Sequence, residues 1–187
     1  MRMGTRLSGR PRFPSAAPHW LAALRAYLLT VAAADLLWET AHLPLYTLWQ
    51  TGTTGKKLFA VVHCTAGDLL IALASLISGL IFAGHRDWPV RRFMVVAAFT
   101  LAFGFGYTVF SEWQNVAVRK SWAYSDLMPV VPILGFNLGV SPLLQWVVVP
   151  TLALWASRRV GATPMPHAKG GTIIGRQNFA ESGKERT

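Results

Sequence analysis

Residues 69–83 read LLIALASLISGLIFA, an unbroken run of apolar and small side chains that carries no charge. A helix needs about 20 mainly apolar residues to cross the hydrocarbon core of a bilayer, which is roughly 30 Å thick. The apolar character of this run begins near residue 58, and only His63 and Asp68 interrupt it with strongly polar side chains. The sequence therefore predicts a membrane-spanning helix over residues 58–83.

Three further segments have a similar length and composition, and we expect them to span the membrane as well: residues 21–46, 91–112 and 138–157. Of the 187 residues in the chain, 52% are hydrophobic and only 14% are charged, a combination that is rare in soluble domains. The predicted fold class is all-α, an integral membrane four-helix bundle whose main partner is the lipid bilayer.

The positions of the 18 Lys and Arg residues predict the orientation of this bundle. Five lie in the N-terminal arm if Arg25 is included, three in the second connection and six from Arg158 onward, whereas the first and third connections hold two each. Lys and Arg in short flanking segments are retained on the cytoplasmic side of a membrane. Both termini are therefore predicted to be cytoplasmic. Because the cations cluster in this way, the net charge of +10 fits a bilayer, and no nucleic-acid partner is expected.

Composition divides the chain into three parts. Residues 1–19 form a basic cytoplasmic arm, residues 20–158 the four-helix transmembrane domain, and residues 159–187 a basic cytoplasmic tail that we expect to be disordered. The outer connection from Trp113 to Asn137 is long and rich in aromatic residues and proline. Such a segment either lies in the membrane interface or folds over the bundle as a lid, and the sequence leaves both alternatives open.

Ionisable side chains inside the spans are the candidate functional residues. A charge within the bilayer costs at least about 2.5–3.5 kcal/mol, so each of them needs a partner or a function. At a rise of 1.5 Å per residue they all fall in the outer half of the bundle, together with Tyr107 and Gln145, above an apolar inner half. The sequence predicts a polar pocket in that outer half, lined by Asp35, Glu39, His42, His63, Asp68 and Glu112.

Metal binding is one interpretation of this pocket. Glu39 and His42 form a Glu-x-x-His pair, a spacing that occurs in the metal sites of four-helix bundles. Imidazole and carboxylate ligands together suit a divalent transition metal, here zinc, iron, manganese or copper. The predicted ligands are Glu39, His42, His63, Asp68 and Glu112.

Two other interpretations use the same side chains without a metal. A buried carboxyl group and a nearby histidine can act as acid and base, with Glu39, Asp68 and Glu112 as catalytic residues and a lipid-soluble molecule from the outer leaflet as substrate. Alternatively, the polar groups pair with one another and only hold the four helices together. Residue types and spacing do not decide between an enzyme, a metal-binding protein and a structural protein.

Three motifs in the C-terminal half resemble those of an uncharacterised family of small bacterial multi-pass inner-membrane proteins: SEWQN at 111–115, SWAYSDLMP at 121–129 and SPLLQW at 141–146. This resemblance implies a bacterial cytoplasmic membrane and no particular activity. The leading functional prediction is a pocket that binds a metal ion or processes a small or lipid-soluble molecule. The alternative is a non-catalytic accessory or assembly subunit that docks on a larger membrane complex or on a second copy of itself.

Overall fold

The computed structural model describes residues 20–133 and 135–162, so the predicted arm over 1–19 and most of the predicted tail lie outside the described residues. Four long helices cover most of the described chain: α1 (Trp20–His42), α3 (Thr54–Ala83), α4 (Phe93–Glu112) and α5 (Val140–Gly161). Each of them is long and apolar enough to cross a membrane. In α1 and α4 the candidate span also includes the short helical segment that follows the helix. The prediction of four helices that are long and apolar enough to span a membrane is thereby confirmed.

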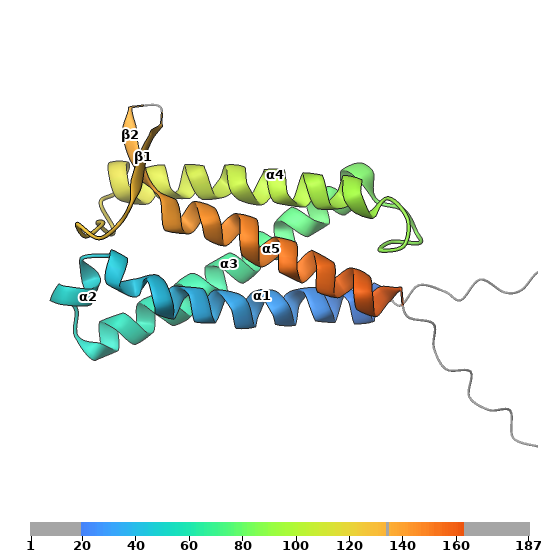
Figure 1. Ribbon diagram of the computed structural model, residues 1–187, viewed down its shortest axis with the longest axis horizontal. Helices are drawn as coiled ribbons and strands as arrows, with labels where there is room; N and C mark the ends of the chain where they lie inside the picture. Colours follow the sequence, from blue (N-terminus) through green and yellow to red (C-terminus); the bar gives the residue numbers. More distant parts are fainter. Residues whose placement is uncertain (1–19, 134, 163–187) are drawn as a thin grey trace, which may run out of the picture.

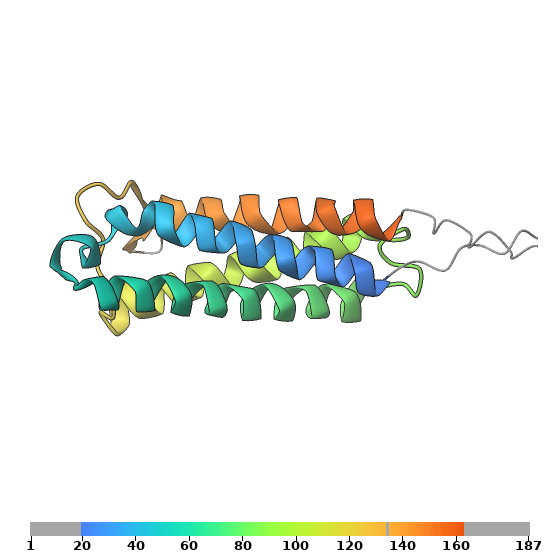
Figure 2. The ribbon, with the colours of Figure 1, turned by 90° about the horizontal axis from the view of Figure 1, so that it is seen from below.

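The four helices form one bundle with both described chain ends at the same end (Figure 1, Figure 2). Helix α1 packs against α3 and α5, and α4 packs against the same two helices. One end of the bundle carries α2 (Leu48–Thr51) and two short strands, β1 (Val130–Ile133) and β2 (Phe136–Gly139), and we call it the hairpin end. We call the opposite end the termini end. Figure 1 shows that α3 runs obliquely, beside α1 at the hairpin end and beside α4 at the termini end.

Local sequence signals explain where the helices begin and end. The side chain of Thr53 caps α3, because its hydroxyl accepts a hydrogen bond from the backbone N–H of Lys56 at 3.3 Å. Pro44 follows the end of α1 and forms part of the short 3-10 helix η1 (Leu43–Leu45). Pro142 lies in the first turn of α5, where the missing N–H of proline leaves no helical hydrogen bond unmade.

The connection between α4 and α5 contains structure that the all-α prediction did not include. The helix of α4 continues as a π-helix, η2 (Trp113–Val118), and two short antiparallel strands follow, β1 (Val130–Ile133) and β2 (Phe136–Gly139), with Val130 paired to Gly139. Gly135 between the strands has a φ of 83°, a backbone conformation that favours glycine in tight turns. The prediction is therefore corrected to a mostly helical bundle with one β-hairpin.

Small residues allow close approach of the helices at two places in the bundle. A Cβ atom at Gly79 of α3 would lie 2.8 Å from Oγ1 of Thr100 and 2.9 Å from the backbone carbonyl oxygen of Val96, both on α4. A Cβ atom at Gly104 of α4 would collide with the indole of Trp146 on α5. These positions act as the small-residue contacts by which membrane helices pack closely.

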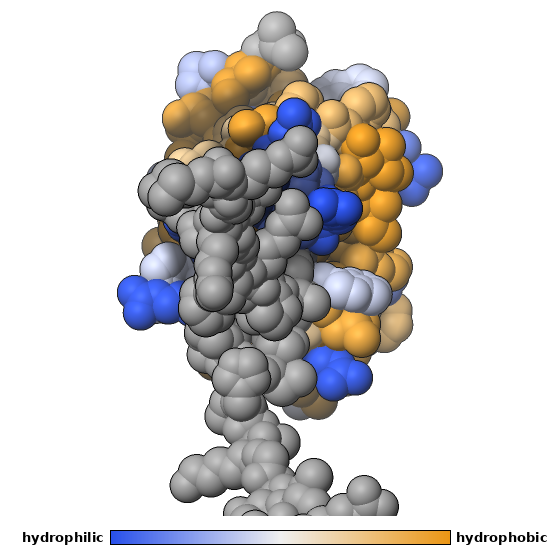
Figure 3. Space-filling model, turned by 90° about the vertical axis from the view of Figure 1, so that its right-hand side faces the viewer, coloured by the Kyte–Doolittle hydropathy of each residue, from blue (hydrophilic) through white to orange (hydrophobic). Residues whose placement is uncertain are grey.

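The termini end carries a group of arginines. Figure 3 views this end, where hydrophilic residues lie both near the centre and at the edge, with apolar residues between them. The guanidinium group of Arg158 lies 4.9 Å from the ring centroid of Phe93, and that of Arg159 lies 4.3 Å from the ring centroid of Trp155. The described arginines on the helices and connection near this end are Arg25, Arg86, Arg91, Arg92, Arg158 and Arg159.

The contact between Gly104 and Trp146 makes a testable prediction about stability. We expect Gly104→Ala to lower the free energy of unfolding by about 1–3 kcal/mol, because the added methyl group overpacks the indole. The matched control is Gly106→Ala, because a Cβ atom at Gly106 would meet no atom within 4 Å. Reversible unfolding in mixed detergent micelles measures both values. Equal unfolding free energies for the two variants would contradict the proposed packing.

Candidate functional site

A cavity of about 340 Å³ lies between the four long helices toward the hairpin end. This volume falls within the range of about 300–1,000 Å³ that is common for small-molecule sites. Five of the six predicted pocket residues line the cavity: Glu39, His42, His63, Asp68 and Glu112. None of the residues that line it is Lys or Arg. The sixth, Asp35, is buried and is linked to the cavity wall through Gln145.

The amide nitrogen of Gln145 on α5 brings three acidic side chains together. It lies 3.1 Å from Oδ1 of Asp35, 3.0 Å from Oε1 of Glu39 and 3.1 Å from Oδ2 of Asp68. The first two acids come from α1 and the third from α3, so this single amide connects three helices. An amide NH₂ group has only two protons to donate, so three carboxyl oxygens compete for two protons.

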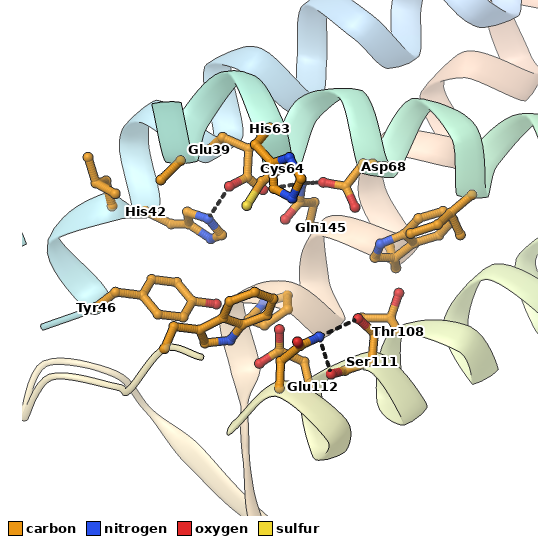
Figure 4. A pocket seen from close by; sticks show the side chains of 18 of the residues that line it. Glu39, His42, Tyr46, His63, Cys64, Asp68, Thr108, Ser111, Glu112 and Gln145 are labelled. Atoms are coloured by element: carbon orange, nitrogen blue, oxygen red, sulfur yellow. Dashed lines mark hydrogen bonds and ion pairs between the residues drawn. The ribbon is translucent and has the colours of Figure 1, made fainter. Parts of the chain in front are cut away.

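His42 continues this polar network toward the hairpin end, on the same wall of the cavity (Figure 4). Its Nε2 atom lies 3.1 Å from Oε2 of Glu39, and its Nδ1 atom lies 3.0 Å from the hydroxyl of Ser141. The indole N–H of Trp38 donates to the same hydroxyl at 3.2 Å. Both ring nitrogens of His42 are therefore engaged, and the buried hydroxyl of Ser141 fixes the orientation of the ring.

Glu112 lies on the other wall of the cavity, near the end of α4 (Figure 4). The phenol of Tyr124 donates a short hydrogen bond to Oε2 of Glu112 and accepts one at 3.0 Å from the backbone N–H of Gly139. Burial, followed by the nearby carboxyl group of Glu112, raises the pKa of Tyr124. Tyr124 therefore stays a phenol and a hydrogen-bond donor at physiological pH.

The segment around Tyr124 is tied to the connection that follows α1. The backbone N–H of Thr47 donates to the carbonyl of Ala123 at 3.0 Å, and the backbone N–H of Ser125 donates to the carbonyl of Leu45 at 2.9 Å. Trp122 lines the cavity, and its buried indole nitrogen, close to Glu112, makes no well-formed hydrogen bond. A bound molecule with an acceptor oxygen would satisfy this donor.

His63 and Cys64 line the cavity from α3. The ring of His63 stacks on that of Phe59 at a centroid distance of 5.3 Å, and His63 is exposed at the surface of the bundle. On an ideal helix His63 and Asp68 differ by about 140° in direction, which predicts that they point to different places. Both nevertheless line this cavity, because it extends along α3.

Three lining or supporting residues were not assigned a role from the sequence: Trp122, Tyr124 and Ser141. Ser141 and Gln145 are four residues apart, so they occupy one face of α5, and this spacing is the signal that could have found Ser141. Tyr124 comes from a connecting segment in which no helical period exists. Its contact with Glu112 depends on a backbone path that the residue pattern does not encode.

The predicted metal site remains a prediction. Within residues 20–133 and 135–162, no group of three His, Cys, Asp or Glu side chains is arranged so that it could hold a metal ion. One physical reason lies in Glu39 and His42, whose side chains bond to each other and to Gln145 and Ser141 instead of converging on a common point. Metal binding by this pair would require that network to rearrange.

No known protein family matches the chain, and neither does any of the curated proteins or solved structures with which it was compared. The family resemblance of the C-terminal motifs therefore stays a prediction. The function must be argued from the site itself.

Gln145→Leu tests the three-helix contact. We expect it to lower the free energy of unfolding by about 1.5–3 kcal/mol, because hydrogen bonds to acidic groups of α1 and α3 are lost in a buried position. Unfolding in mixed micelles provides the measurement, and Gln50→Leu, a change of the same size at an exposed position of α2, is the control. If both variants unfold like the unchanged protein, the amide does not hold these helices together.

Proposed function

We propose that this polytopic membrane protein catalyses proton transfer on a lipid-soluble molecule held in the cavity. The observation that carries the proposal is the placement of acidic groups on two facing walls of a single cavity that has no Lys or Arg in its lining. Glu39 and Asp68 lie on one wall and Glu112 on the other (Figure 4). A molecule between them would have a proton donor on one side and an acceptor on the other.

The wall formed by α1 and α3 supplies the acid in this proposal. Asp35, Glu39 and Asp68 all lie within hydrogen-bond distance of one nitrogen, and the residues that line the cavity include no Lys or Arg. Like charges so close together in a medium of low dielectric constant repel strongly, so the group retains at least one proton.

Glu112 supplies the base. The phenol of Tyr124, a neutral donor from the connecting segment, hydrogen-bonds to Oε2 of Glu112 and would stabilise an ionised carboxylate without protonating it. Two acidic groups in different environments can divide the roles of acid and base between them. Addition of a proton at one position of the bound molecule and removal from another would, for example, move a double bond with no net change in composition.

The distribution of cations supports an orientation in which this cavity would lie in the outer half of the membrane, here proposed to be a bacterial inner membrane. Six described arginines lie near the termini end, whereas Lys56, Lys57, Arg119 and Lys120 lie near the hairpin end. By the rule that cations stay on the cytoplasmic side, both termini would be cytoplasmic. The proposed substrate would then come from the outer leaflet.

Deuterium incorporation tests proton transfer even while the substrate is unidentified. The purified protein is placed in vesicles made from total bacterial membrane lipid and is incubated in D₂O. Lipid extracts are then returned to H₂O and analysed by mass spectrometry for deuterium that does not exchange back. We expect at least one lipid-soluble compound to gain deuterium at carbon. Glu39→Gln or Glu112→Gln should slow this by about 10²–10⁴-fold, the usual contribution of a catalytic acid or base.

Asp126→Asn is the matched control, because Asp126 is an exposed acidic residue outside the cavity lining, at the same end of the bundle. It should incorporate deuterium at the unchanged rate. If no compound gains more deuterium than in protein-free vesicles, the proposal is wrong. Elemental analysis of the same preparation provides a separate result. Near-stoichiometric metal that is lost in His42→Ala would favour metal binding over catalysis by the acidic side chains alone.

A further inference from the structure

The cavity has a mouth on the side of the bundle, between α3 and α4. His63 of α3 and Tyr107 of α4 line the cavity and are also exposed at the molecular surface, Tyr107 to 48%. The acids on the opposite side of the cavity are buried, with Glu39 only 8% exposed. The cavity therefore leads from a surface opening between two helices to a buried acidic interior.

The oblique path of α3 creates this opening. Near the termini end, α3 and α4 touch at Gly79 and Thr100, so closely that a Cβ atom could not be added at Gly79. Toward the hairpin end the two helices separate (Figure 1), and a Cβ atom at Gly67 would meet no atom within 4 Å. Gly67 also lines the cavity.

The depth of the mouth determines what can reach it. Gly67 lies near the middle of the apolar helix Thr54–Ala83, and Tyr107 lies near the middle of the apolar segment Phe93–Val118. A spanning helix has its middle in the hydrocarbon region of the bilayer. At the hairpin end, backbone hydrogen bonds join residues 123–125 to residues 45–47 beside the cavity. The lateral mouth therefore faces lipid chains.

We infer that the ligand enters sideways from the hydrocarbon of the bilayer, through the mouth between α3 and α4, and that it is a neutral or cationic amphiphile. Its polar group would lie between the acidic walls, and its apolar part would pass out between the helices, beside exposed aromatic side chains such as Phe59 and Phe110. Repulsion disfavours an anionic head group, because the lining includes three carboxyl groups and two histidines but no Lys or Arg. The route of entry stands without catalysis, whereas the identity of this ligand as a substrate rests on the proposed function.

Carbodiimides of different solubility test the route of entry. A protonated carboxyl group transfers its proton to a carbodiimide nitrogen while its oxygen adds to the central carbon. The resulting O-acylisourea rearranges to a stable N-acylurea, so the whole reagent is added and nothing leaves. In phosphatidylcholine vesicles we expect lipid-soluble dicyclohexylcarbodiimide to modify Glu39, Asp68 or Glu112. A water-soluble cationic carbodiimide should leave them unmodified, and peptide mass spectrometry identifies the labelled residues.

Filling the mouth should remove this labelling. Gly67→Phe places a large side chain in the opening, and Gly106→Phe is its matched control, since Gly106 also has open space where a Cβ would stand but does not line the cavity. We expect labelling to be lost in Gly67→Phe and unchanged in Gly106→Phe. Ala60→Phe, at a second lining position of α3, replaces Gly67→Phe if that variant does not fold. Unchanged labelling in the folded mouth variant, or equal labelling by the water-soluble reagent, would overturn the inference.

Two amphiphiles with the same chain length test the ligand class. Dodecyltrimethylammonium, below its solubilising concentration, should slow the labelling, whereas dodecanesulfonate should not. Equal or stronger protection by the sulfonate would refute the charge preference. Labelling requires no turnover, so it can succeed where deuterium incorporation fails, and then only the proposed catalysis is lost. The reverse outcome would retain catalysis and remove the lateral route.

Discussion

One amide nitrogen holds the polar interior of this bundle together. Gln145 donates to acidic groups from α1 and α3 that would otherwise face one another in an apolar environment, although Glu39 also contacts His42. The requirement that buried polar groups be hydrogen-bonded therefore fixes the rotation of α5 relative to α1 and α3. The orientation of His42 depends on the same constraint, because Ser141 lies one helical turn before Gln145 on α5.

Hydrophobicity and segment length were sufficient to predict the four spanning helices, because lipid requires every backbone polar group to be satisfied within the segment. The depth of the ionisable residues was sufficient to predict that Glu39, His42, His63, Asp68 and Glu112 border one pocket. Both arguments use distance along a helix, which the sequence contains directly. The roles assigned to these residues do not follow from depth alone and stay predictions.

The shape of the cavity could not be read in this way, because it depends on the crossing of α3 and α4. The two helices can cross so closely because residue 79 is glycine, and any larger residue there would collide with Thr100 and Val96. In the sequence, glycines at Gly67, Gly79 and Gly106 look alike, yet only Gly79 lies at a close contact between α3 and α4. The hairpin and the contact of Tyr124 with Glu112 were missed for a related reason, since connecting segments have no period to interpret.

Structural pairing alone explains the wall formed by α1, α3 and α5, since those acids meet the amide that joins their helices. It does not explain Glu112 equally well. The described hydrogen bond of this carboxyl group goes to Tyr124, twelve residues further along the chain, and joins none of the long helices to another. Burial of an ionisable group is costly in a membrane, and Glu112 is only 6% exposed. A second acid that faces the first wall across an open cavity is therefore better accounted for by a molecule bound between the two walls than by the stability of the bundle.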